Sequence, residues 1–514
     1  MIMFIKLLLL IIFFAVMLGV GFYVRHQASS VDGFVLGGRT VGPWLTAFAF
    51  GTSYFSAVVF VGYAGQFGWK YGLASTWIGL GNAMIGSLLA WVILGRRTRI
   101  MTQHLDSRTM PDFFGLRYDS KALRIVASLI VFIFLIPYTA SLYNGLSRLF
   151  EMAFSIPYQV CVIVMAALTA VYVIIGGYMA TALNDFIQGI IMLFGIVAVV
   201  VAVLEGQGGF MNAVRELAEI PSDVAATEGQ PGAFTSFFGT DPANLFGVVV
   251  LTSLGTWGLP QMIGKFYAIR DEKSVNTGTI ISTVFAIVVS GGCYFLGGFG
   301  RLFDNPSLYG ADGSVIYDSI VPYMLSTLPD VLIGIVIVLV LSASMSTLSS
   351  LVLTSSSTMT LDLIKDNLVH DMDEKKQLGC MRILIVFFVF ISVIIALDPP
   401  TFIAQLMGIS WGALAGAFLA PFLYGLYWKG VTKAAVWASF AAGIGITVSN
   451  MFLKYIASPI NAGAIAMAAG LVIVPVVSLI TPKMDRSKID SIFECYEEEV
   501  LIKKKYSLKE EEES

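Results

Sequence analysis

Charged residues are scarce in this sequence of 514 amino acids. Asp, Glu, Lys and Arg together make up 13% of it, about half the fraction found in an average soluble protein. The two signs nearly balance, because the formal net charge is −3, and there is no basic tract. Nucleic acid is therefore not expected as a partner, and the composition excludes an ordinary water-soluble protein.

Cysteine and histidine are also rare. The four cysteines (Cys161, Cys293, Cys380 and Cys495) are far apart and lack metal-site spacing, so we interpret them as packing residues rather than as a disulfide framework. The three histidines are equally scattered and form no catalytic or metal cluster. No polar segment is long enough for a separate soluble domain. We therefore expect no catalytic residues and no enzymatic activity, and we look for function among the helices.

Apolar runs of about 20 residues are abundant, and this is the length that a helix needs to cross a bilayer. Hydrophobic residues make up 57% of the chain. The sequence predicts an all-α polytopic membrane protein with about thirteen transmembrane helices. They are expected near residues 4–24, 43–69, 72–95, 122–150, 157–175, 183–205, 244–266, 277–300, 329–363, 380–397, 401–428, 432–454 and 461–481. The first run lacks a small-residue cleavage site before its basic flank, so it is predicted to be a retained helix.

The connecting loops alternate in charge. The basic segments GRRTRIMTQHLDSR, KFYAIRDEK and KDNLVHDMDEKKQ and the tail KKKYSLKEEEES are predicted to lie together in the cytoplasm. The longest alternate loop, near 205–244, has one Arg and several acidic residues, as expected on the outer face. An odd number of crossings then places the N-terminus outside and the C-terminus inside. The Lys/Glu-rich tail is interpreted as a solvated, partly disordered end.

Two of the expected helices contain residues that interrupt helices. The second run carries Gly-Thr-Ser at 51–53, and the seventh carries Gly255, Gly258 and Pro260. Pro costs roughly 3 kcal/mol and Gly roughly 1 kcal/mol inside a helix, and a broken backbone is tolerated at membrane depth where it lines a cavity. The interruptions are five helices apart, which is the arrangement of an inverted-repeat transporter. The alternative is that these residues only allow close packing and kinks.

One apolar run is unusually rich in hydroxyl groups. It contains LSASMSTLSS at residues 341–350, directly after VLIGIVIVLV. Ala343, Ser346, Thr347 and Ser350 follow the spacing i, i+3, i+4, i+7 and so share one helix face. Hydroxyl groups supply neutral oxygen ligands to a hard cation such as sodium without burying further charge. The alternative is that Ser and Thr pack helices closely or bond to the carbonyl four residues back. We prefer that alternative for the two serines off this face, Ser342 and Ser344.

Asp185 is the acidic residue nearest to membrane depth, at the expected start of the sixth run. An ionised residue costs roughly 2.5–3.5 kcal/mol at the centre of a membrane helix, so such a residue marks an ion or proton site by default. The alternative is an interfacial aspartate that caps the helix N-terminus, where the helix dipole favours it. The sequence leaves both interpretations open.

Four segments together resemble the sodium:solute symporter family. They are DGFVLGGRTVGPWLTAFAFGTSYFS, GGYMATALNDFIQGIIMLFG, LSASMSTLSS and PTFIAQLMGISWGALAGAFLAPFLYGLYWKG. The resemblance covers roughly residues 1–485 in the family's order, and WGLPQMIGKFYAIRDEKS is similar to the sodium/proline and sodium/pantothenate symporters. It implies a five-plus-five inverted-repeat (LeuT-like) core with two broken helices, and alternating access driven by the sodium ion.

The resemblance also implies a division of the chain. Residues 1–42 would hold an extra helix and a cytoplasmic loop, and 43–243 the first repeat with an outer loop. The second repeat would follow at 244–430, two C-terminal helices at 431–485, and a cytoplasmic tail at 486–514.

Sodium ligands are carried over from the family position by position. The principal site maps to the carbonyls of Thr52, Phe55 and Ala343 and the hydroxyls of Ser346 and Thr347. A second site, found in some members, maps to Asp185, Ser346, Ser349 and Ser350, all of which carry a suitable oxygen.

The solute is less well defined by the resemblance. The sodium/proline members have Asp where this chain has Tyr54, and Trp and Tyr where it has Thr252 and Thr256. We expect the solute between the two broken helices. The candidate contacts are Ser53, Tyr54, Ser56, Tyr138, Ser141, Thr256, Trp257, Gln261 and Trp411. No buried Arg or Lys is expected among them, so a neutral or zwitterionic solute is favoured.

The predicted function is sodium-coupled symport of a small organic solute, such as an amino acid like proline or a pantothenate-like carboxylate. Proton coupling, a sugar or sialate-type solute, and a transporter-like sensor are the alternatives, and a passive channel is disfavoured by the broken helices. The partners are then the solute, sodium and the lipid bilayer. A monomer suffices for this function, and an oligomer stays open. The expected location is the plasma membrane, as a bacterial inner-membrane protein.

Overall fold

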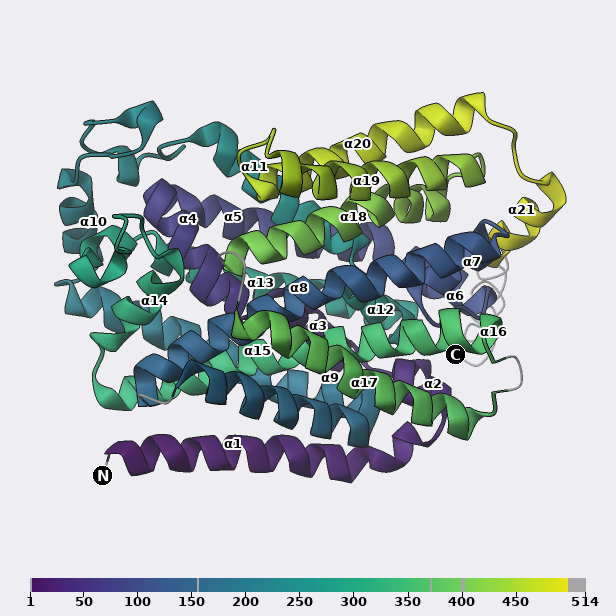
Figure 1. The fold of residues 1–514 in the computed structure, drawn as a ribbon, viewed down its shortest axis with the longest axis horizontal. Helices are drawn as coiled ribbons and strands as arrows, with labels where there is room; N and C mark the ends of the chain where they lie inside the picture. The colour runs from purple at the N-terminus through teal and green to yellow at the C-terminus, as the bar shows by residue number, and fades with distance from the viewer. Residues whose placement is uncertain (1, 155–156, 370–371, 399–402, 498–514) are drawn as a thin grey trace, which may run out of the picture.

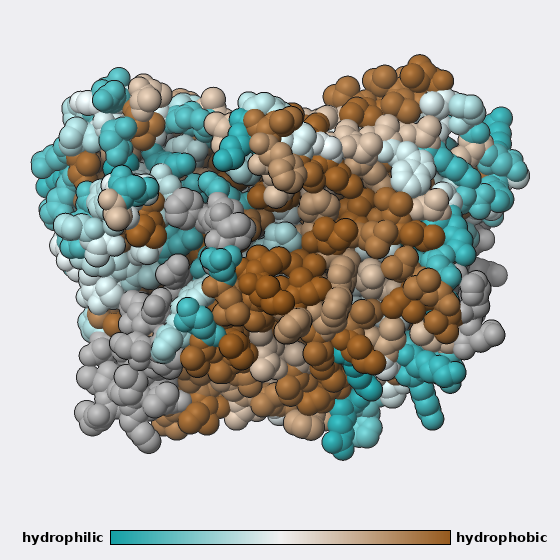
Figure 2. Space-filling model, in the orientation of Figure 1, coloured by the Kyte–Doolittle hydropathy of each residue, from teal (hydrophilic) through white to brown (hydrophobic). Residues whose placement is uncertain are grey.

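The computed structural model describes residues 2–154, 157–369, 372–398 and 403–497. Most of this part is helical, and its β pairing consists of two isolated bridges, Val41 with Ile269 and Tyr309 with Val315. The long helices run along the longest axis of the molecule (Figure 1). Hydrophobic residues form a broad band across the middle of the face shown in Figure 2, and hydrophilic residues gather at its two ends. This is the surface expected of helices that cross a bilayer, and it confirms the predicted all-α membrane fold.

Two helices in the structure are about twice as long as one membrane crossing, and this affects the count of crossings. In the described part, ten helices are long and apolar enough to cross a membrane, or eleven if a bent pair, Pro242–Gly258 with Pro260–Ala268, counts as one. Two of the ten, Val58–His104 and Tyr158–Gly206, have 47 and 49 residues, about twice the length of one crossing. Each contains a glycine with positive φ, Gly72 at 60° and Gly177 at 53°. When each of these two helices is counted as two crossings and the bent pair as one, the described residues give thirteen crossings, as predicted.

Contacts with α1 (Ile2–Val24) show that the chain folds back near Gly177. A Cβ atom added to Gly21 of α1 would lie 3.6 Å from the Tyr172 carbonyl oxygen, and Asn184 donates to the Met17 carbonyl at 3.3 Å. In a straight helix, residues 172 and 184 would be about 18 Å apart, whereas residues 17 and 21 are separated by roughly one turn. Element α9 (Tyr158–Gly206) is therefore two helices that meet at Gly177.

The long elements follow the predicted order. The first set comprises α3 (Pro43–Tyr54), η3 (Val58–Tyr63), α4 (Ala64–Tyr71), α5 (Thr76–Gly81), η5 (Asn82–Leu89), η6 (Trp91–Gly95), α6 (Arg96–His104), α8 (Lys121–Phe154) and α9. The second set comprises α11 (Pro242–Leu254), η9 (Gly255–Gly258), α12 (Pro260–Ala268), α13 (Glu272–Gly297), α15 (Asp330–Thr358), η12 (Met359–Ile364), α17 (Glu374–Leu397) and α18 (Ile403–Tyr427). Two further helices, α19 (Lys433–Leu453) and α20 (Pro459–Ile480), pack on α18.

Shorter helices cover the two ends of the bundle. One end, at the left in Figure 1, carries α10 (Phe210–Glu219) and α14 (Tyr317–Ser326) and the start of α1. The other end carries α6, α7 (Met110–Arg117), α16 (Lys365–Asn367) and α21 (Arg486–Phe493), while α2 (Val31–Leu36) follows α1. The predicted tail begins with α21, whose Phe493 ring lies 5.0 Å from the buried Arg117 guanidinium. The KKKYSLKEEEES segment lies outside the described residues.

Both predicted helix breaks are present. The first lies at Phe55–Ser56, slightly after the Gly-Thr-Ser that suggested it, and Phe55 has non-helical angles (φ −105°, ψ 87°). The second spans η9 and Leu259, which is extended, and α11 and α12 meet there at an angle of 46°. Gly255 and Gly258 are needed there for close packing. Added Cβ atoms would lie 2.7 Å from the Trp411 ring and 2.8 Å from the Ala415 Cα atom of α18.

Candidate functional site

The hydroxyl-bearing face of α15 packs against the break in α3. The Ser346 and Thr347 hydroxyl groups each donate to the Thr52 carbonyl at 3.1 Å. Each of these hydroxyl oxygens also lies 3.2 Å from the Ala343 carbonyl oxygen, so its single proton is shared between the two carbonyls. All four residues are buried. Four oxygen atoms from two helices therefore converge on one place inside the protein.

The local chain direction makes this place attractive to a cation. Thr52 lies in the last turn of α3, and the Phe55 amide caps the helix by donating to the Gly51 carbonyl at 3.0 Å. The C-terminal end of a helix carries partial negative charge on its free carbonyls, which stabilises cations. Among the described residues, no group of three or more His, Cys, Asp or Glu side chains could hold a metal ion. The oxygen atoms gathered here are neutral carbonyl and hydroxyl oxygens, which suit sodium.

The hydroxyl groups outside this cluster behave differently. Ser344 donates to the Val340 carbonyl four residues back, at 2.7 Å, as expected for a packing serine. The Ser342 hydroxyl is buried without a hydrogen-bond partner among the described residues. Ser349, a predicted ligand of the second sodium site, donates to the Ser346 carbonyl at 2.8 Å. The hydroxyl groups of Ser346 and Thr347 therefore bond to α3, whereas none of these three serines does so.

A buried lysine, Lys265, lies beside the candidate positions, although it is not one of them. Lys265 is the first residue of the basic segment KFYAIRDEK and also falls at the end of the run expected at 244–266. In the structure it lies in α12 with 2% of its side chain exposed. Its Nζ donates to the Ser350 hydroxyl at 2.9 Å and lies 3.6 Å from the Asp185 carboxylate. The one sequence signal is that Lys265 follows Gln261 by four residues, which places both on the same face of the helix after the second break.

Asp185 does not cap a helix N-terminus. It lies eight residues beyond the turn at Gly177, within the second half of α9, and its side chain is fully buried. Its charged partner is Lys265 from α12. The interpretation as an interfacial cap is therefore wrong, and Asp185 belongs to the interior of the bundle.

Part of the predicted solute site forms an aromatic cluster near the first break. The Tyr54 ring stacks on Phe55 with 4.2 Å between centroids and lies 6.0 Å from Trp411. Tyr138 of α8 meets Trp411 edge-on at 5.9 Å, and its hydroxyl lies beside Ser56. The Tyr54 hydroxyl donates to the Thr252 carbonyl at 2.5 Å and so joins the two broken helices. All these side chains are buried.

The other predicted solute contacts point elsewhere. Ser53 bonds to Ser350 (2.9 Å), Ser141 to the Tyr138 carbonyl (2.6 Å), Thr256 to the Gly86 carbonyl (3.0 Å) and the Trp257 indole to the Ile85 carbonyl (3.0 Å). The Gln261 side chain is buried and has no hydrogen-bond partner among the described residues. It lines the small cavity that also holds Lys265. A buried amide without a protein partner is available to a bound molecule or ion.

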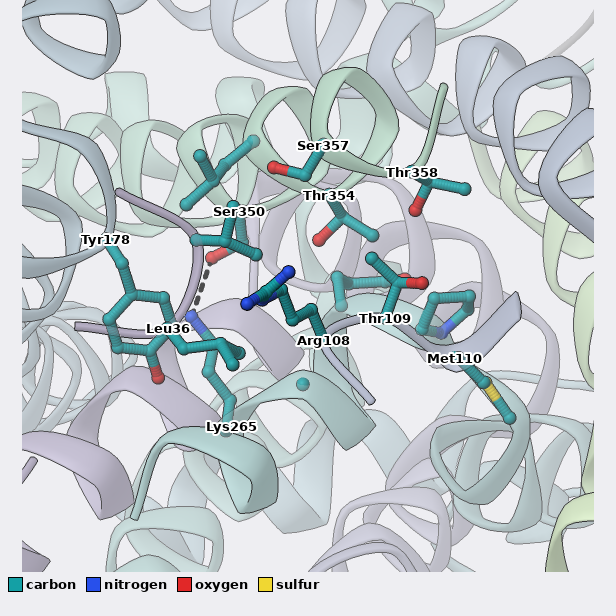
Figure 3. Close-up of a pocket in the computed structure, with 15 residues that line it drawn as sticks. Leu36, Arg108, Thr109, Met110, Tyr178, Lys265, Ser350, Thr354, Ser357 and Thr358 are labelled. Atoms are coloured by element: carbon teal, nitrogen blue, oxygen red, sulfur yellow. Dashed lines mark hydrogen bonds between the residues drawn. The ribbon is translucent and has the colours of Figure 1, made fainter. Parts of the chain in front are cut away.

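Two cavities lie toward opposite ends of the broken α11–α12 pair. The larger, of about 410 Å³, is lined by the end of α4 and the start of α11, and it contains Lys70, Asp241, Arg301 and Asp223. The smaller, of about 50 Å³, is lined by α12 and the last turns of α15, and Figure 3 shows its polar residues. The buried aromatic cluster and η9 lie between these cavities, so the central position is closed to both ends. Closure at the centre with approaches from both sides fits alternating access.

The larger cavity contains an ion pair outside the membrane-spanning segments. Arg301 donates to both carboxylate oxygens of Asp223, at 2.8 and 2.5 Å. Partial burial acts to raise the pKa of Asp223, but the Arg301 guanidinium outweighs it and holds this pKa below its ordinary value. The pair links the loop before α11 to the segment after α13. It also leaves this end of the bundle with fixed charges of both signs.

Comparisons with known proteins bear on the family and the fold of this chain. The model of the sodium:solute symporter family matches residues 34–443. The osmoregulated proline transporter OpuE of Bacillus subtilis is 29% identical over 444 residues, which cover 84% of this chain and 85% of that protein. A sodium/proline symporter of Staphylococcus aureus is 29% identical over 466 residues, which cover 86% and 85% of the two chains.

Solved structures support the fold. A sodium-coupled sialic acid symporter in a substrate-bound outward-open state aligns with a TM-score of 0.76 at 17% identity, covering 94% of this chain and 98% of that one. Mhp1, a nucleobase-cation-symport-1 family transporter, aligns with a TM-score of 0.54 at 13% identity, covering 89% and 97%. The five-plus-five arrangement of helices around two broken ones is therefore the fold of this chain.

Proposed function

Because the chain belongs to the sodium:solute symporter family and is a multi-pass membrane protein that couples solute transport to sodium, we propose where it binds both. The sodium ion binds at the junction of α3 and α15, held by the carbonyls of Thr52, Phe55 and Ala343 and the hydroxyls of Ser346 and Thr347. The solute binds beside it, against the aromatic cluster.

One observation carries the sodium assignment, namely the approach of the two α15 hydroxyl groups to the Thr52 carbonyl. With sodium bound, the hydroxyl groups turn their lone pairs to the ion, and the hydrogen bonds to the carbonyls are given up. The end of α3 and the side of α15 are then held together by the ion. Sodium binding thereby favours a particular packing of α15 on α3, which is the differential interaction that a coupling ion must supply.

The solute that we propose is a small neutral or zwitterionic molecule with an apolar body, in the class of amino acids. The cluster of Tyr54, Tyr138 and Trp411 offers an apolar wall with a few polar edges, which suits such a solute. The relatives named as proline transporters support this class. Proline itself is less favoured, because Tyr54 stands where the sodium/proline members carry Asp.

The cytoplasmic end of the protein is proposed to be the one with α6, α7 and α21, following the basic loops. The N-terminus would then lie outside and the C-terminus inside, in a bacterial inner membrane. The domain division at residues 43, 244 and 431 is retained as part of this proposal, with one helix before the two repeats and two after them.

Uptake into proteoliposomes tests the proposal. A panel of labelled amino acids, including proline, and carboxylates is offered with an inward sodium gradient, with an inward pH gradient, or with neither. We expect uptake of at least one zwitterionic solute with the sodium gradient only. One charge that crosses 100 mV is worth about 2.3 kcal/mol, or roughly 50-fold accumulation. Uptake driven by the pH gradient and indifferent to sodium would overturn the proposal.

A further inference from the structure

The side-chain ammonium of Lys265 contacts three residues from two other elements, α15 and α9. Its Nζ donates to Ser350 of α15 at 2.9 Å, lies 3.6 Å from the Asp185 carboxylate of α9, and lies 5.3 Å from the Tyr178 ring centroid. Figure 3 shows the bond to Ser350 and the Tyr178 ring beside it. A carboxylate, a hydroxyl oxygen and an aromatic face are all favourable partners for a cation.

Two of these partners are the residues that would define a second sodium site. Asp185 would supply its negative charge, and Ser350 would supply a neutral oxygen from α15. Here, both face one ammonium group that carries the same charge as a sodium ion. Two cations beside one carboxylate repel strongly in a medium of low dielectric constant, so Lys265 and a second sodium ion compete for this place.

We propose that Lys265 is a covalently attached cation that occupies the second sodium position, so that this symporter binds one sodium ion per cycle. The inference rests on the proposed principal site and adds to it the number of coupled ions. Lys265 is then the residue that determines stoichiometry, because its ammonium neutralises Asp185 in every state in which the two remain paired.

The tethered cation is connected to the principal site. Ser350 shares a hydrogen bond of 2.9 Å with the Ser53 hydroxyl, and the Ser53 carbonyl lies 3.5 Å from the Thr347 hydroxyl. Lys265 thus fixes α12, the second half of the broken pair, to the same segments of α3 and α15 that would hold sodium. A charge placed there acts on the principal sodium ion through a short path in the protein interior.

The nearby cavity disfavours an additional mobile cation. It has a volume of about 50 Å³, which is enough for a few water molecules, so the charge of its lining rather than its size acts against a cation. Besides Lys265, its lining includes Arg108, whose Nε lies 2.6 Å from Asp32. The approach to Asp185 from this side therefore passes two positive side chains.

Sodium binding to the full-length protein tests this inference without knowledge of the solute. Purified protein in detergent is titrated with ²²Na⁺ at constant ionic strength, with choline as the replacing cation. We expect the wild type to bind one sodium ion per chain with a Hill coefficient of about 1. Lys265→Ala frees Asp185 and Ser350, so we expect a second bound sodium and a Hill coefficient that rises toward about 2, the limit set by the number of sites.

Two further variants separate charge from shape. Lys265→Arg keeps a cation in place and is expected to retain one sodium ion. The double variant Lys265→Ala/Asp185→Asn removes both charges and is expected to return from two sodium ions to one. Each variant is first checked for a single symmetric peak in gel filtration.

The wild type alone can overturn the inference, whatever the variants do. Two sodium ions bound per wild-type chain would show that Lys265 does not take the second position. A folded Lys265→Ala variant that still binds one sodium would also refute it. If instead Thr347→Val leaves the single wild-type binding curve unchanged, the principal-site assignment fails rather than the role of Lys265.

Discussion

Replacing Thr347 by valine tests the sodium site with little change in shape. Valine has the branched form of threonine and lacks its hydroxyl oxygen. Thr347 is fully buried, and its hydroxyl lies 3.1 Å from the Thr52 carbonyl and 3.2 Å from that of Ala343. The substitution therefore removes one proposed ligand without opening a cavity.

The expected cost differs with and without sodium. In the sodium-free protein, Ser346 still donates to both carbonyls, so the loss is that of an ordinary hydrogen bond, about 1 kcal/mol. With sodium bound, the lost oxygen would have faced a full charge, and interactions with charged groups contribute about 1.5–3 kcal/mol. Sodium affinity falls by the difference between these costs, about 0.5–2 kcal/mol, so it should decrease by roughly 2- to 30-fold while the protein stays folded.

The measurement is the ²²Na⁺ binding curve of purified protein, followed by the sodium dependence of uptake for any solute that the panel identifies. Thr347→Ser restores the hydroxyl group and should recover most of the affinity. Ser344→Ala is the matched control on the same helix, because the Ser344 hydroxyl bonds only to its own helix at Val340. It should bind sodium as the wild type does.

The reasoning would be refuted by a folded Thr347→Val protein with unchanged sodium affinity. Equal losses in Thr347→Val and Ser344→Ala would also contradict it, because they would indicate a general effect on α15 rather than the loss of a ligand. A loss in Thr347→Val that Thr347→Ser does not recover would point to packing by the methyl group.

Two further predictions concern stability. Gly68→Ala would place a Cβ atom 1.9 Å from the Gly297 carbonyl oxygen and force α4 away from α13, whereas an added Cβ atom at Gly291 meets nothing within 4 Å. We expect Gly68→Ala to lower the free energy of unfolding by about 1–3 kcal/mol or more, which a lower melting temperature would show. Gly291→Ala should show no such loss. Because Arg301 lowers the pKa of Asp223, the pair stabilises the end of the bundle that carries α10 and α14 above the ordinary aspartate pKa of about 3.9. It ceases to do so as pH falls through the lowered value. Arg301→Gln should flatten this acid dependence in a pH series of melting temperatures, and an unchanged profile would contradict the assignment.

Much of this protein can be predicted from local features of its sequence. Runs of about 20 apolar residues suffice to indicate crossings, since backbone groups in lipid must bond within their own helix. Gly258 and Pro260 weaken a helix wherever they occur, so they marked the second break. The spacing of Ser346 and Thr347 put both hydroxyl groups on one face of α15 before any partner was known. The membership of the family then suggested what that face meets.

Other features depended on packing between distant segments. Asp185 and Lys265 are 80 residues apart, and Ser350 is 85 residues from Lys265. A lysine next to a broken helix has the same local sequence whether it ends in water or inside the bundle. Sequence patterning therefore left Lys265 at the boundary between a helix and a loop, and only the packing of α9, α12 and α15 brought it to Asp185.

The sequence by itself determined the membrane-spanning helices, their two breaks and the hydroxyl face of α15, because each follows from residues close together in the chain. The tertiary structure decided which helix faces meet, where α9 turns back at Gly177, and that Asp185 faces an ammonium group. The physical reason is that helix formation is governed by local hydrogen bonding and periodicity. The environment of a buried charge is instead set by whichever side chains distant helices bring to it.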